Sequence, residues 1–235
     1  MAEDLAFDLE KAGAQTAIWS CIEVEAENFS HCLQYLKQDV HCVFISQNAV
    51  RFALENEACF EQLKKMQSFY AIGQATAKLL QEALGKEVIY PDYASSEALL
   101  DLENLQNTKN KKFVIFRGGE GRELIKETLE ERGALLNYIE CYSRKRPSVE
   151  STALITQQFQ SSETYDWIIF TSFQALQNAW SALDDPSVLL KSKITVTNDR
   201  MLAWAQDKGF QSILRLNNMS NHGILERLAK GCDND

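Results

Sequence analysis

The sequence predicts an α/β protein made of two similar domains, each with a parallel sheet flanked by helices. Two observations support this prediction. Short β-branched segments alternate with longer helical ones, which is typical of parallel sheets. The two halves of the chain also repeat each other, because Leu9–Ala14 returns as Leu129–Ala134 and Val43–Ser46 returns as Ile169–Ser172. Since solenoid repeats are only about 20–50 residues long, a repeat of half a chain indicates two related domains.

Runs rich in β-branched and aromatic residues predict the strands. In chain order these are Ala17–Glu25, His41–Ile45, Phe69–Ile72, Glu87–Tyr90, Lys112–Phe116, Leu136–Ser143, Trp167–Thr171, Lys193–Thr197 and Ser212–Arg215. The stretches between them have apolar residues at helical spacing. They predict helices at Asp4–Ala12, Phe29–Lys37, Asn48–Glu57, Ala75–Leu84, Ser96–Leu102, Gly121–Arg132, Phe173–Ala182, Arg200–Lys208 and Gly223–Lys230. Glycine follows three of these helices, at positions 85, 133 and 209, where a left-handed residue commonly ends a helix.

Two extended segments, Trp19–Ala26 and Cys141–Ser148, carry charges where a buried parallel strand would be apolar. We interpret them as a two-stranded connector, along which the chain leaves the first domain and later returns to it. Domain one then comprises residues 1–22 and 146–235, and domain two comprises residues 23–145. The alternative is two sequential domains divided near residue 120.

The composition argues against several classes of protein. Hydrophobic residues make up 45% of the chain and charged residues 24%, as in soluble globular proteins. The net charge of −9 argues against nonspecific binding to nucleic acid, although a local pocket can still attract a small anion. The six cysteines and three histidines are not spaced as a metal site or redox pair, so we expect reduced thiols in a cytoplasmic protein. The acidic N-terminus is not a signal peptide, and no apolar run approaches the roughly 18 residues that span a membrane.

Small and polar residues follow several predicted strands, at the turns into the next helices. These turns are Ser46–Asn48, Gly73–Thr76, Ser95–Ser96, Gly118–Gly121 and Thr171–Phe173. Ligands bind at the carboxyl edge of a parallel sheet, where helix N-termini offer free N–H groups and a partial positive charge. One such turn is more often an ordinary helix cap, but five of them in two matching domains indicate a cleft for an anionic ligand. Arg117 and Arg122 flank the most glycine-rich turn, which is either a carboxylate-binding loop or a plain flexible turn.

The sequence contains no nucleophile elbow, catalytic triad or zincin helix. Acid–base chemistry would therefore fall to a tyrosine or a carboxylate, or the site would act largely by electrostatic positioning. Tyr142 lies in the second connector segment and is one candidate, although tyrosines are usually packing residues.

Several motifs, in their order and spacing, resemble one known family over nearly the whole chain. Phe44–Val50 is similar to an F-T-S-x-x-A-V turn, Ile72–Ala77 to an I-G-x-x-T-A turn, and Pro91–Leu99 to a P-x-x-x-S-S-E-x-L pattern. Arg117–Arg122 with the later Tyr142 is similar to an R-G-x-x-G-R helix and its following tyrosine, and Phe170–Ser172 repeats the first turn. This set of motifs resembles the uroporphyrinogen-III synthases.

The resemblance implies two α/β domains joined by a two-stranded ladder, and a lyase of porphyrin and heme biosynthesis. Such an enzyme cyclises hydroxymethylbilane to uroporphyrinogen III with inversion of ring D and loss of water, and uses neither cofactor nor metal. Tyr142 would assist departure of the hydroxyl group. The implied substrate-binding residues are Ser46, Gln47, Asn48, Gly73, Gln74, Thr76, Arg117, Gly118, Arg122, Thr171, Ser172 and Phe173. The protein would be a cytoplasmic monomer, with the substrate and the upstream hydroxymethylbilane synthase as partners and no contact with nucleic acid or membrane.

The chain departs from the family pattern in three places. Ile45 replaces the usual threonine, and Val196–Met201 lacks the glycine and threonine of the corresponding turn, although Arg200 could take part of their role. The first half also has no counterpart of the strand and loop at Phe113–Gly121. We therefore expect domain one to lack its first strand, through an upstream start or through truncation that impairs the enzyme. A cytoplasmic two-lobed binding protein for an anionic small molecule, without catalysis, is the alternative function.

Overall fold

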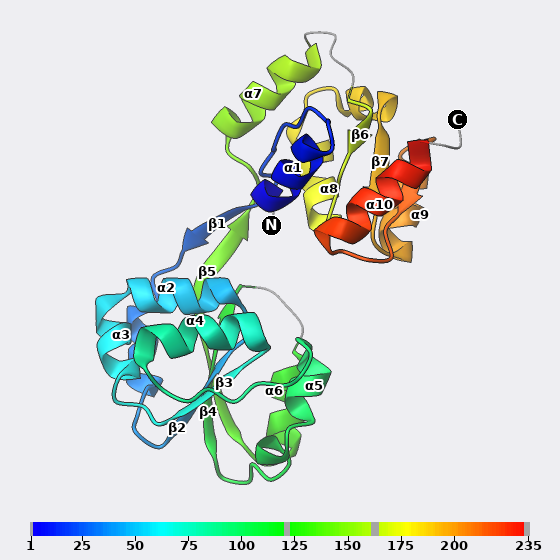
Figure 1. Cartoon of the computed structure of the whole chain (residues 1–235). Coiled ribbons are helices and arrows are strands. Elements are labelled where there is room, and N and C mark those ends of the chain that lie inside the picture. Colours follow the sequence, from blue (N-terminus) through cyan, green and yellow to red (C-terminus); the bar gives the residue numbers. More distant parts are fainter. Residues whose placement is uncertain (1, 120–122, 161–164, 233–235) are drawn as a thin grey trace. The chain divides into compact units, whose positions relative to one another are not determined.

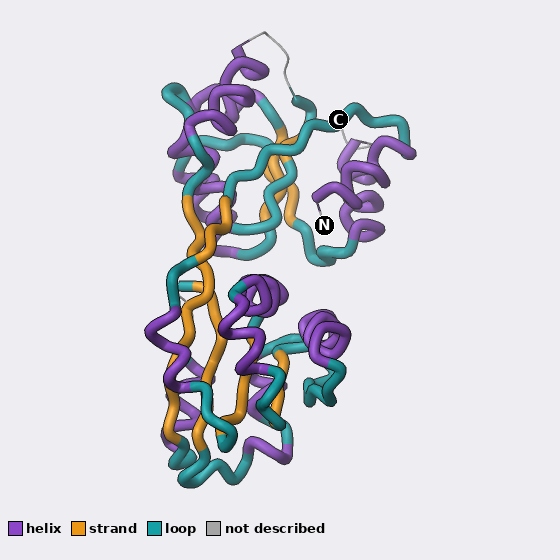
Figure 2. The backbone as a smooth tube through the Cα atoms, turned by 90° about the vertical axis from the view of Figure 1, so that its left-hand side faces the viewer, coloured by secondary structure: helices purple, strands orange, loops and turns teal. Residues whose placement is uncertain are grey.

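The computed structural model describes residues 2–119, 123–160 and 165–232, and confirms the α/β class (Figure 1). The chain divides into two compact units. Unit 1 comprises Met1–Glu23 and Lys145–Asp235, and unit 2 comprises Val24–Arg144. Both boundaries fall within strands, β1 (Glu23–Ala26) and β5 (Leu135–Lys145), which are neighbours in one sheet and run side by side in Figures 1 and 2. The chain thus passes between the units twice, along adjacent strands.

The sheet of unit 2 has the order β1-β5-β4-β2-β3. Its inner strands are β4 (Lys112–Gly118) and β2 (Val40–Phe44), and β3 (Ser68–Ala71) lies beyond β2. The pairs β2–β3, β2–β4 and β4–β5 are parallel. The apolar run Phe113–Phe116 within β4 suits this central place, because a strand covered on both faces buries both rows of its side chains.

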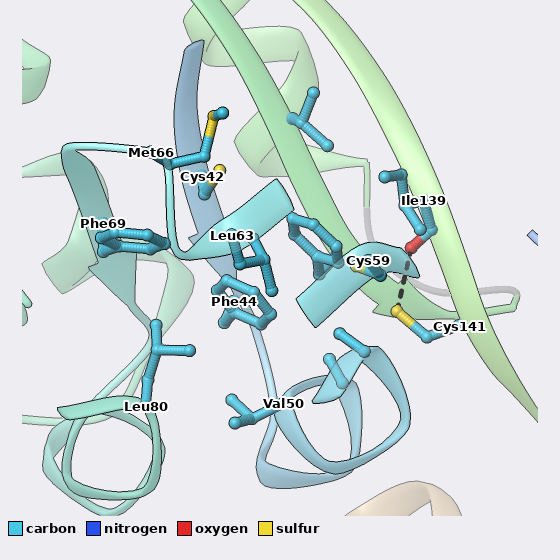
Figure 3. Packing of buried hydrophobic residues seen from close by; sticks show 14 of the residues in the cluster. Cys42, Phe44, Val50, Cys59, Leu63, Met66, Phe69, Leu80, Ile139 and Cys141 are labelled. Carbon is cyan, nitrogen blue, oxygen red and sulfur yellow. Dashed lines mark hydrogen bonds between the residues drawn. The ribbon is translucent and has the colours of Figure 1, made fainter. Parts of the chain in front are cut away.

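Helices cover both faces of this sheet. One face packs against the 3₁₀ helix η1 (Ser30–Tyr35), α2 (Gln47–Glu55), α3 (Glu57–Leu63) and α4 (Gln74–Leu84), in the core drawn in Figure 3. Within this core the rings of Phe44 and Phe116 stack with centroids 4.2 Å apart. The other face packs against α5 (Ser96–Leu100), the 3₁₀ helix η2 (Glu103–Leu105) and α6 (Leu124–Glu131).

Unit 1 is built around a parallel sheet with the order β6-β7-β8, formed by Trp167–Ile168, Lys193–Val196 and Ile213–Arg215. One core joins it to α8 (Phe173–Ala182), the 3₁₀ helix η3 (Pro186–Lys191) and α9 (Asp199–Asp207). A second core contains residues of α1 (Ala2–Lys11) and α10 (Asn221–Cys232). Helix α7 (Val149–Gln160) follows the return of the chain to this unit.

The repeat seen in the sequence forms the same local structure twice. Gly13 follows the end of α1 and Gly133 follows the end of α6, with left-handed φ angles of 92° and 81°. In each copy the next alanine donates a backbone hydrogen bond to the leucine five residues earlier, Ala14 to Leu9 at 3.1 Å and Ala134 to Leu129 at 2.9 Å. Glycine is favoured there because a left-handed conformation strains other residues.

Some predicted elements were wrong. Glu87–Tyr90 is not a strand, because only Ile89 bridges to Tyr70 before Pro91 removes the next donor. The predicted helix Phe29–Lys37 is a 3₁₀ helix. The helix predicted at Asn48–Glu57 is interrupted by Asn56, whose side chain accepts a bond from the N–H of Cys59 and begins α3. Helices α3, α7, η2 and η3 were not predicted.

Two further observations concern compartment and membrane. Cys21, Cys32, Cys42, Cys59 and Cys141 are free thiols. Among the described residues, no helix has the length and apolar character needed to cross a membrane.

Candidate functional site

Three of the turns singled out in the sequence lie at one edge of the sheet in unit 2. Strand β2 leads to Ser46, β3 to Gly73, and β4 ends at Gly118. In the parallel ladder Phe44 pairs with Ala71 on one side and with Phe116 on the other, so the three turns follow neighbouring strands at the same level. The structure therefore brings these predicted residues together, at the edge where α/β proteins bind ligands.

Ser46 has two hydrogen-bonding roles at this edge. Its backbone is extended, and its Oγ accepts a bond of 3.0 Å from the N–H of Ala49, which caps α2. The same Oγ lies 3.0 Å from the phenol oxygen of Tyr142, which comes from a strand 96 residues later. Gln47 is exposed and Asn48 half-buried in the first turn of α2. A cap hydroxyl is thus shared between a helix N-terminus and a tyrosine.

A β-bulge aims Tyr142 at Ser46. Arg117 of β4 pairs with Glu140 of β5, but the next residue, Gly118, pairs with Tyr142, so Cys141 is an extra residue in β5. Cys141 and Tyr142 consequently belong to the same core, although consecutive strand residues normally face opposite sides. Bulges next to active sites often redirect a side chain in this way.

Tyr142 is held tightly in the position that the bulge gives it. Only 2% of the residue is exposed, and its ring stacks on Phe52 of α2 with centroids 5.7 Å apart. On another side, a Cβ at Gly118 would lie 2.5 Å from Cε2 of the ring. The absence of a side chain at Gly118 therefore makes room for the phenol.

A pocket of about 380 Å³ opens beside Tyr142 within unit 2. Its lining includes Phe29, Tyr142 and two carboxylates, Glu27 and Glu140. It also includes Cys32, whose thiol pKa is raised by burial and by the charge of Glu140, so a thiolate nucleophile is disfavoured. His31 and Tyr138 also line this pocket, so Tyr142 is one of several polar side chains in it.

The turn before α4 contributes mainly through its backbone. A Cβ at Gly73 would lie 2.5 Å from Cβ of Ala94, so glycine lets the following loop pack against the start of the helix. Thr76 is buried, with 4% of its surface exposed, whereas Gln74 is exposed.

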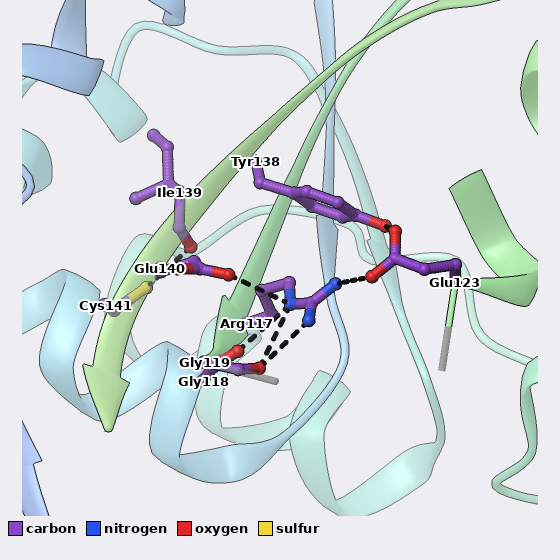
Figure 4. Close-up of polar contacts among 8 residues, drawn as sticks. All are labelled: Arg117, Gly118, Gly119, Glu123, Tyr138, Ile139, Glu140 and Cys141. Carbon is purple, nitrogen blue, oxygen red and sulfur yellow. Dashed lines mark hydrogen bonds and ion pairs between the residues drawn. The ribbon is translucent and has the colours of Figure 1, made fainter. Parts of the chain in front are cut away.

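The guanidinium of Arg117 is bonded to groups of the protein itself, whereas a residue that binds substrate carboxylates would have free N–H donors (Figure 4). Its side chain is 5% exposed. Its Nη1 donates to Oε1 of Glu123 at 2.8 Å, and its Nη2 donates to the carbonyl of Gly119 at 3.0 Å. The hydrogen bond from Arg117, and then one from Tyr138, lower the pKa of Glu123. Arg122, the other predicted cation of this loop, lies outside the described residues.

The remaining predicted residues belong to unit 1. Ser172 caps α8 as Ser46 caps α2, accepting from the N–H of Ala175 at 3.1 Å, and Thr171 is exposed beside it. Phe173 meets Trp204 edge-on at 6.0 Å, and the guanidinium carbon of Arg200 lies 4.7 Å from its ring centroid. The cap of α2 is thus repeated in α8, and the residue that follows it packs among aromatic and cationic side chains.

Glu123 and Tyr138 were not singled out from the sequence, although both contact Arg117. The spacing of Tyr138 and Glu140, which share one face of a regular strand, was a signal for Tyr138, whereas no signal marked Glu123. No group of three or more potential metal-ligating residues occurs in the part of the chain that the structure describes.

The fold and the site define a two-unit α/β protein in which helix N-termini and a serine–tyrosine pair gather at one sheet edge. A family model described as Uroporphyrinogen-III synthase HemD matches residues 3–214 of the chain. The chain belongs to the uroporphyrinogen-III synthase family.

Individual relatives agree with this assignment. The uroporphyrinogen-III synthase of Escherichia coli is 34% identical over 191 residues, which cover 78% of this chain and 76% of that protein. The enzyme of Salmonella typhimurium is 33% identical over the same length and coverage. The structure of uroporphyrinogen-III synthetase from Helicobacter pylori covers 94% of both chains with a TM-score of 0.65 at 19% identity. A mutant uroporphyrinogen III synthase from Thermus thermophilus covers 100% of this chain and 96% of its own, with a TM-score of 0.57 at 17% identity. These two structures share the fold of this chain.

Proposed function

We propose that this chain converts hydroxymethylbilane to uroporphyrinogen III and that Tyr142 assists the departure of the substrate's hydroxyl group. The observation that supports this role is the 3.0 Å contact between Tyr142 and Ser46 at the carboxyl edge of the sheet, and Tyr142 also lines a pocket of unit 2. Membership of the uroporphyrinogen-III synthase family supports the overall reaction.

The hydrogen-bond arrangement permits the phenol to donate its proton, because either oxygen of the Ser46–Tyr142 contact can be the donor. Ser46 Oγ already accepts from Ala49, so its own proton can be donated to the oxygen of Tyr142. The O–H of Tyr142 is then free to donate to the terminal hydroxyl of the substrate. Breaking of the C–O bond releases water and leaves an azafulvene, and the proton lost from the pyrrole nitrogen restores the phenol. The substituted carbon of ring D attacks this electrophile to form a spiro intermediate, whose fragmentation and reclosure invert ring D.

Binding of the substrate would rest on backbone donors. We infer that its carboxylates bind at the N-termini of α2 and α4 through the turns at Ser46–Asn48 and Gly73–Thr76, because these termini present N–H groups and a positive dipole end. The pocket beside Tyr142 is lined by the carboxylates of Glu27 and Glu140, which would repel a carboxylate of the substrate. The pocket therefore suits the hydroxymethyl end of the substrate, where the reaction takes place. The corresponding turn of unit 1, Thr171–Phe173, would bind further carboxylates.

The setting of the reaction follows the family. We infer that the protein is a cytoplasmic monomer that receives hydroxymethylbilane from the synthase that makes it. Among the described side chains, five cysteines are free thiols, which supports a reducing compartment. Size-exclusion chromatography with light scattering, alone and mixed with the upstream synthase, tests the oligomeric state and the partnership.

A coupled assay tests the proposed reaction. Hydroxymethylbilane is generated in the presence of the protein, the products are oxidised, and the porphyrin isomers are separated. The wild type is expected to give isomer III, whereas Tyr142→Phe should lower its rate by about 10²-fold, as loss of a general acid or positioned donor does. Tyr35→Phe removes a hydroxyl from a tyrosine packed on the same core and is the matched control.

Two results would contradict the proposal. Isomer I alone, which forms spontaneously, would refute the synthase activity and leave the non-catalytic binding protein. If isomer III formed equally fast with Tyr142→Phe and Tyr35→Phe, Tyr142 would have no part in catalysis.

A further inference from the structure

A buried cation lies behind the proposed catalytic tyrosine. The guanidinium of Arg117 is almost fully enclosed, and such a charge is stable in a protein only when it is paired and hydrogen-bonded. Glu123 supplies the close partner at 2.8 Å, and Glu140 lies 3.6 Å from Nε. The ring of Tyr138 covers one face of the guanidinium, with 4.4 Å between its centroid and the guanidinium carbon.

Glu123 holds two residues at once. One of its oxygens accepts from Arg117, and the other accepts from the phenol of Tyr138 at 2.7 Å (Figure 4). Burial and the neighbouring Glu123 raise the pKa of Tyr138, so this phenol keeps its proton and remains a donor. Glu123 therefore fixes Arg117 from the side and also fixes the ring that covers it.

Arg117 in turn fixes the backbone that surrounds Tyr142. Its Nε donates to the carbonyl of Gly118 at 3.0 Å and its Nη2 to that of Gly119 at 3.0 Å. Gly118 lies against the ring of Tyr142, and the N–H of Gly119 donates to the carbonyl of Tyr142 at 2.9 Å. A continuous chain of contacts thus runs from Glu123 through Arg117 and the two glycines to Tyr142.

We propose that Glu123 and Tyr138 are positioning residues, which hold Arg117 so that the Gly118–Gly119 backbone places the phenol of Tyr142 for the reaction. This inference rests on the proposed role of Tyr142. It gives Arg117 a structural task in place of direct contact with substrate carboxylates, because its donors point to Glu123 and to carbonyls of its own loop.

A double-mutant cycle in the coupled assay tests the link. Glu123→Gln keeps the shape of the side chain and removes the charge that holds Arg117. We expect kcat for isomer III to fall about 10-fold with KM within about twofold, because loss of positioning affects the transition state more than binding. Tyr138→Phe should show the same pattern with a smaller loss. In the Tyr142→Phe background, Glu123→Gln should cause no further loss, because the group that it positions is already absent.

The controls separate positioning from general destabilisation. Glu127→Gln changes an exposed carboxylate on α6, the helix that begins directly after Glu123, and should retain wild-type kinetics. A variant that only lowers the folded fraction would reduce activity equally in both backgrounds, so additive losses would overturn the inference. A raised KM with unchanged kcat would also overturn it, since Arg117 would then act in substrate binding. If Tyr142→Phe itself had no effect, the proposed function of Tyr142 would fail, whereas an effect of Tyr142→Phe without one of Glu123→Gln would refute only the positioning role.

Discussion

Gly118 lies directly against the ring of Tyr142: a Cβ at position 118 would be 2.5 Å from Cε2, 2.6 Å from Cζ and 3.0 Å from the phenol oxygen. Real Cβ atoms do not approach neighbours this closely. A residue with a side chain at position 118 would therefore displace the ring of Tyr142. Gly118 was predicted from the sequence to contact substrate, and the structure gives it this additional reason to be glycine.

Gly118→Ala should therefore displace the proposed catalytic phenol. Overpacking of a filled core costs about 1–3 kcal/mol, and we expect isomer III formation to fall at least about 10-fold. Gly119→Ala is the matched comparison, because a Cβ there would meet nothing within 4 Å, and it should lose far less activity and stability. Steady-state rates and urea unfolding of both variants measure the difference. Equal behaviour of the two variants would show that the ring is free to move aside.

Ser46→Ala should separate stability from catalysis. The substitution removes the cap of α2, which costs about 1 kcal/mol, and also removes the partner of Tyr142. Asn56→Ala removes a cap of the same kind from α3, where no tyrosine hydroxyl is bound. We expect similar losses of stability in the two variants but a lower kcat, by about 10-fold, only for Ser46→Ala. A similar kcat for both would mean that the Ser46–Tyr142 contact does not serve the reaction.

The sequence predicted the α/β class and the turns at Ser46, Gly73 and Gly118 because those features are local. Strand sequences, cap residues and helix-ending glycines each act over a few residues, and parallel pairing then places the turns side by side. The second helix after Ser46 was missed because Asn56 acts as a cap inside an apparently continuous helical pattern. The environment of Arg117 could not be predicted, since Glu123 and Tyr138 reach it only after β4 and β5 pair and β5 bulges.

The bulge at Cys141 shows the same limit. Regular alternation along β5 would place Tyr142 on the face of Tyr138, away from Ser46. One inserted residue reverses this, and no local sequence signal marked the insertion. The candidate residues could thus be named from motifs, but the contact between Ser46 and Tyr142 required the structure.

His41 should make the stability of unit 2 depend on pH. Its Nδ1 lies 2.6 Å from Oγ of Ser68, and its ring stacks on Phe113 at 4.8 Å. Burial, followed by the charge of Lys111, lowers the pKa of His41, while Asp39 opposes the shift. Below the ordinary histidine pKa of about 6.5, the unfolded chain therefore takes up a proton before the folded one does. The free energy of unfolding should fall as pH decreases through this window, and level off below the folded pKa.

The experiment compares wild type with His41→Gln, whose amide stays neutral throughout. All four tryptophans lie in unit 1, so tryptophan fluorescence follows the unfolding of that unit alone. Far-ultraviolet circular dichroism follows both units, and the difference between the two transitions reports unit 2. The wild type should lose more stability in urea between pH 7 and pH 5 than His41→Gln does. Exposed His222, changed to Gln, serves as the control and should keep the wild-type pH dependence. An identical pH dependence in His41→Gln and wild type would contradict the assignment.

Thr195 should contribute strongly to the stability of unit 1, at the carboxyl end of its sheet. Its fully buried hydroxyl accepts from the N–H of Phe170 at 2.9 Å and donates to the carbonyl of the same residue at 3.2 Å. Strand β6 ends at Ile168, so this side chain satisfies backbone groups that lie beyond the ladder and directly precede the turn at Thr171. Thr195→Val keeps the shape but leaves both groups buried without this partner, and should lower the free energy of unfolding by about 2–4 kcal/mol.

Tryptophan fluorescence during urea unfolding measures this loss directly, because the tryptophans report unit 1. Thr197→Val is the matched control, since its hydroxyl contacts the side chains of Met201 and Asn198 and no backbone group is orphaned by its removal. Its cost should stay below about 1 kcal/mol. If the two substitutions cost the same, the pair of bonds from Thr195 would contribute no more than a surface contact. If Thr195→Val also slowed isomer III formation beyond its loss of folded protein, the geometry of the Thr171–Phe173 turn would be needed for the reaction as well.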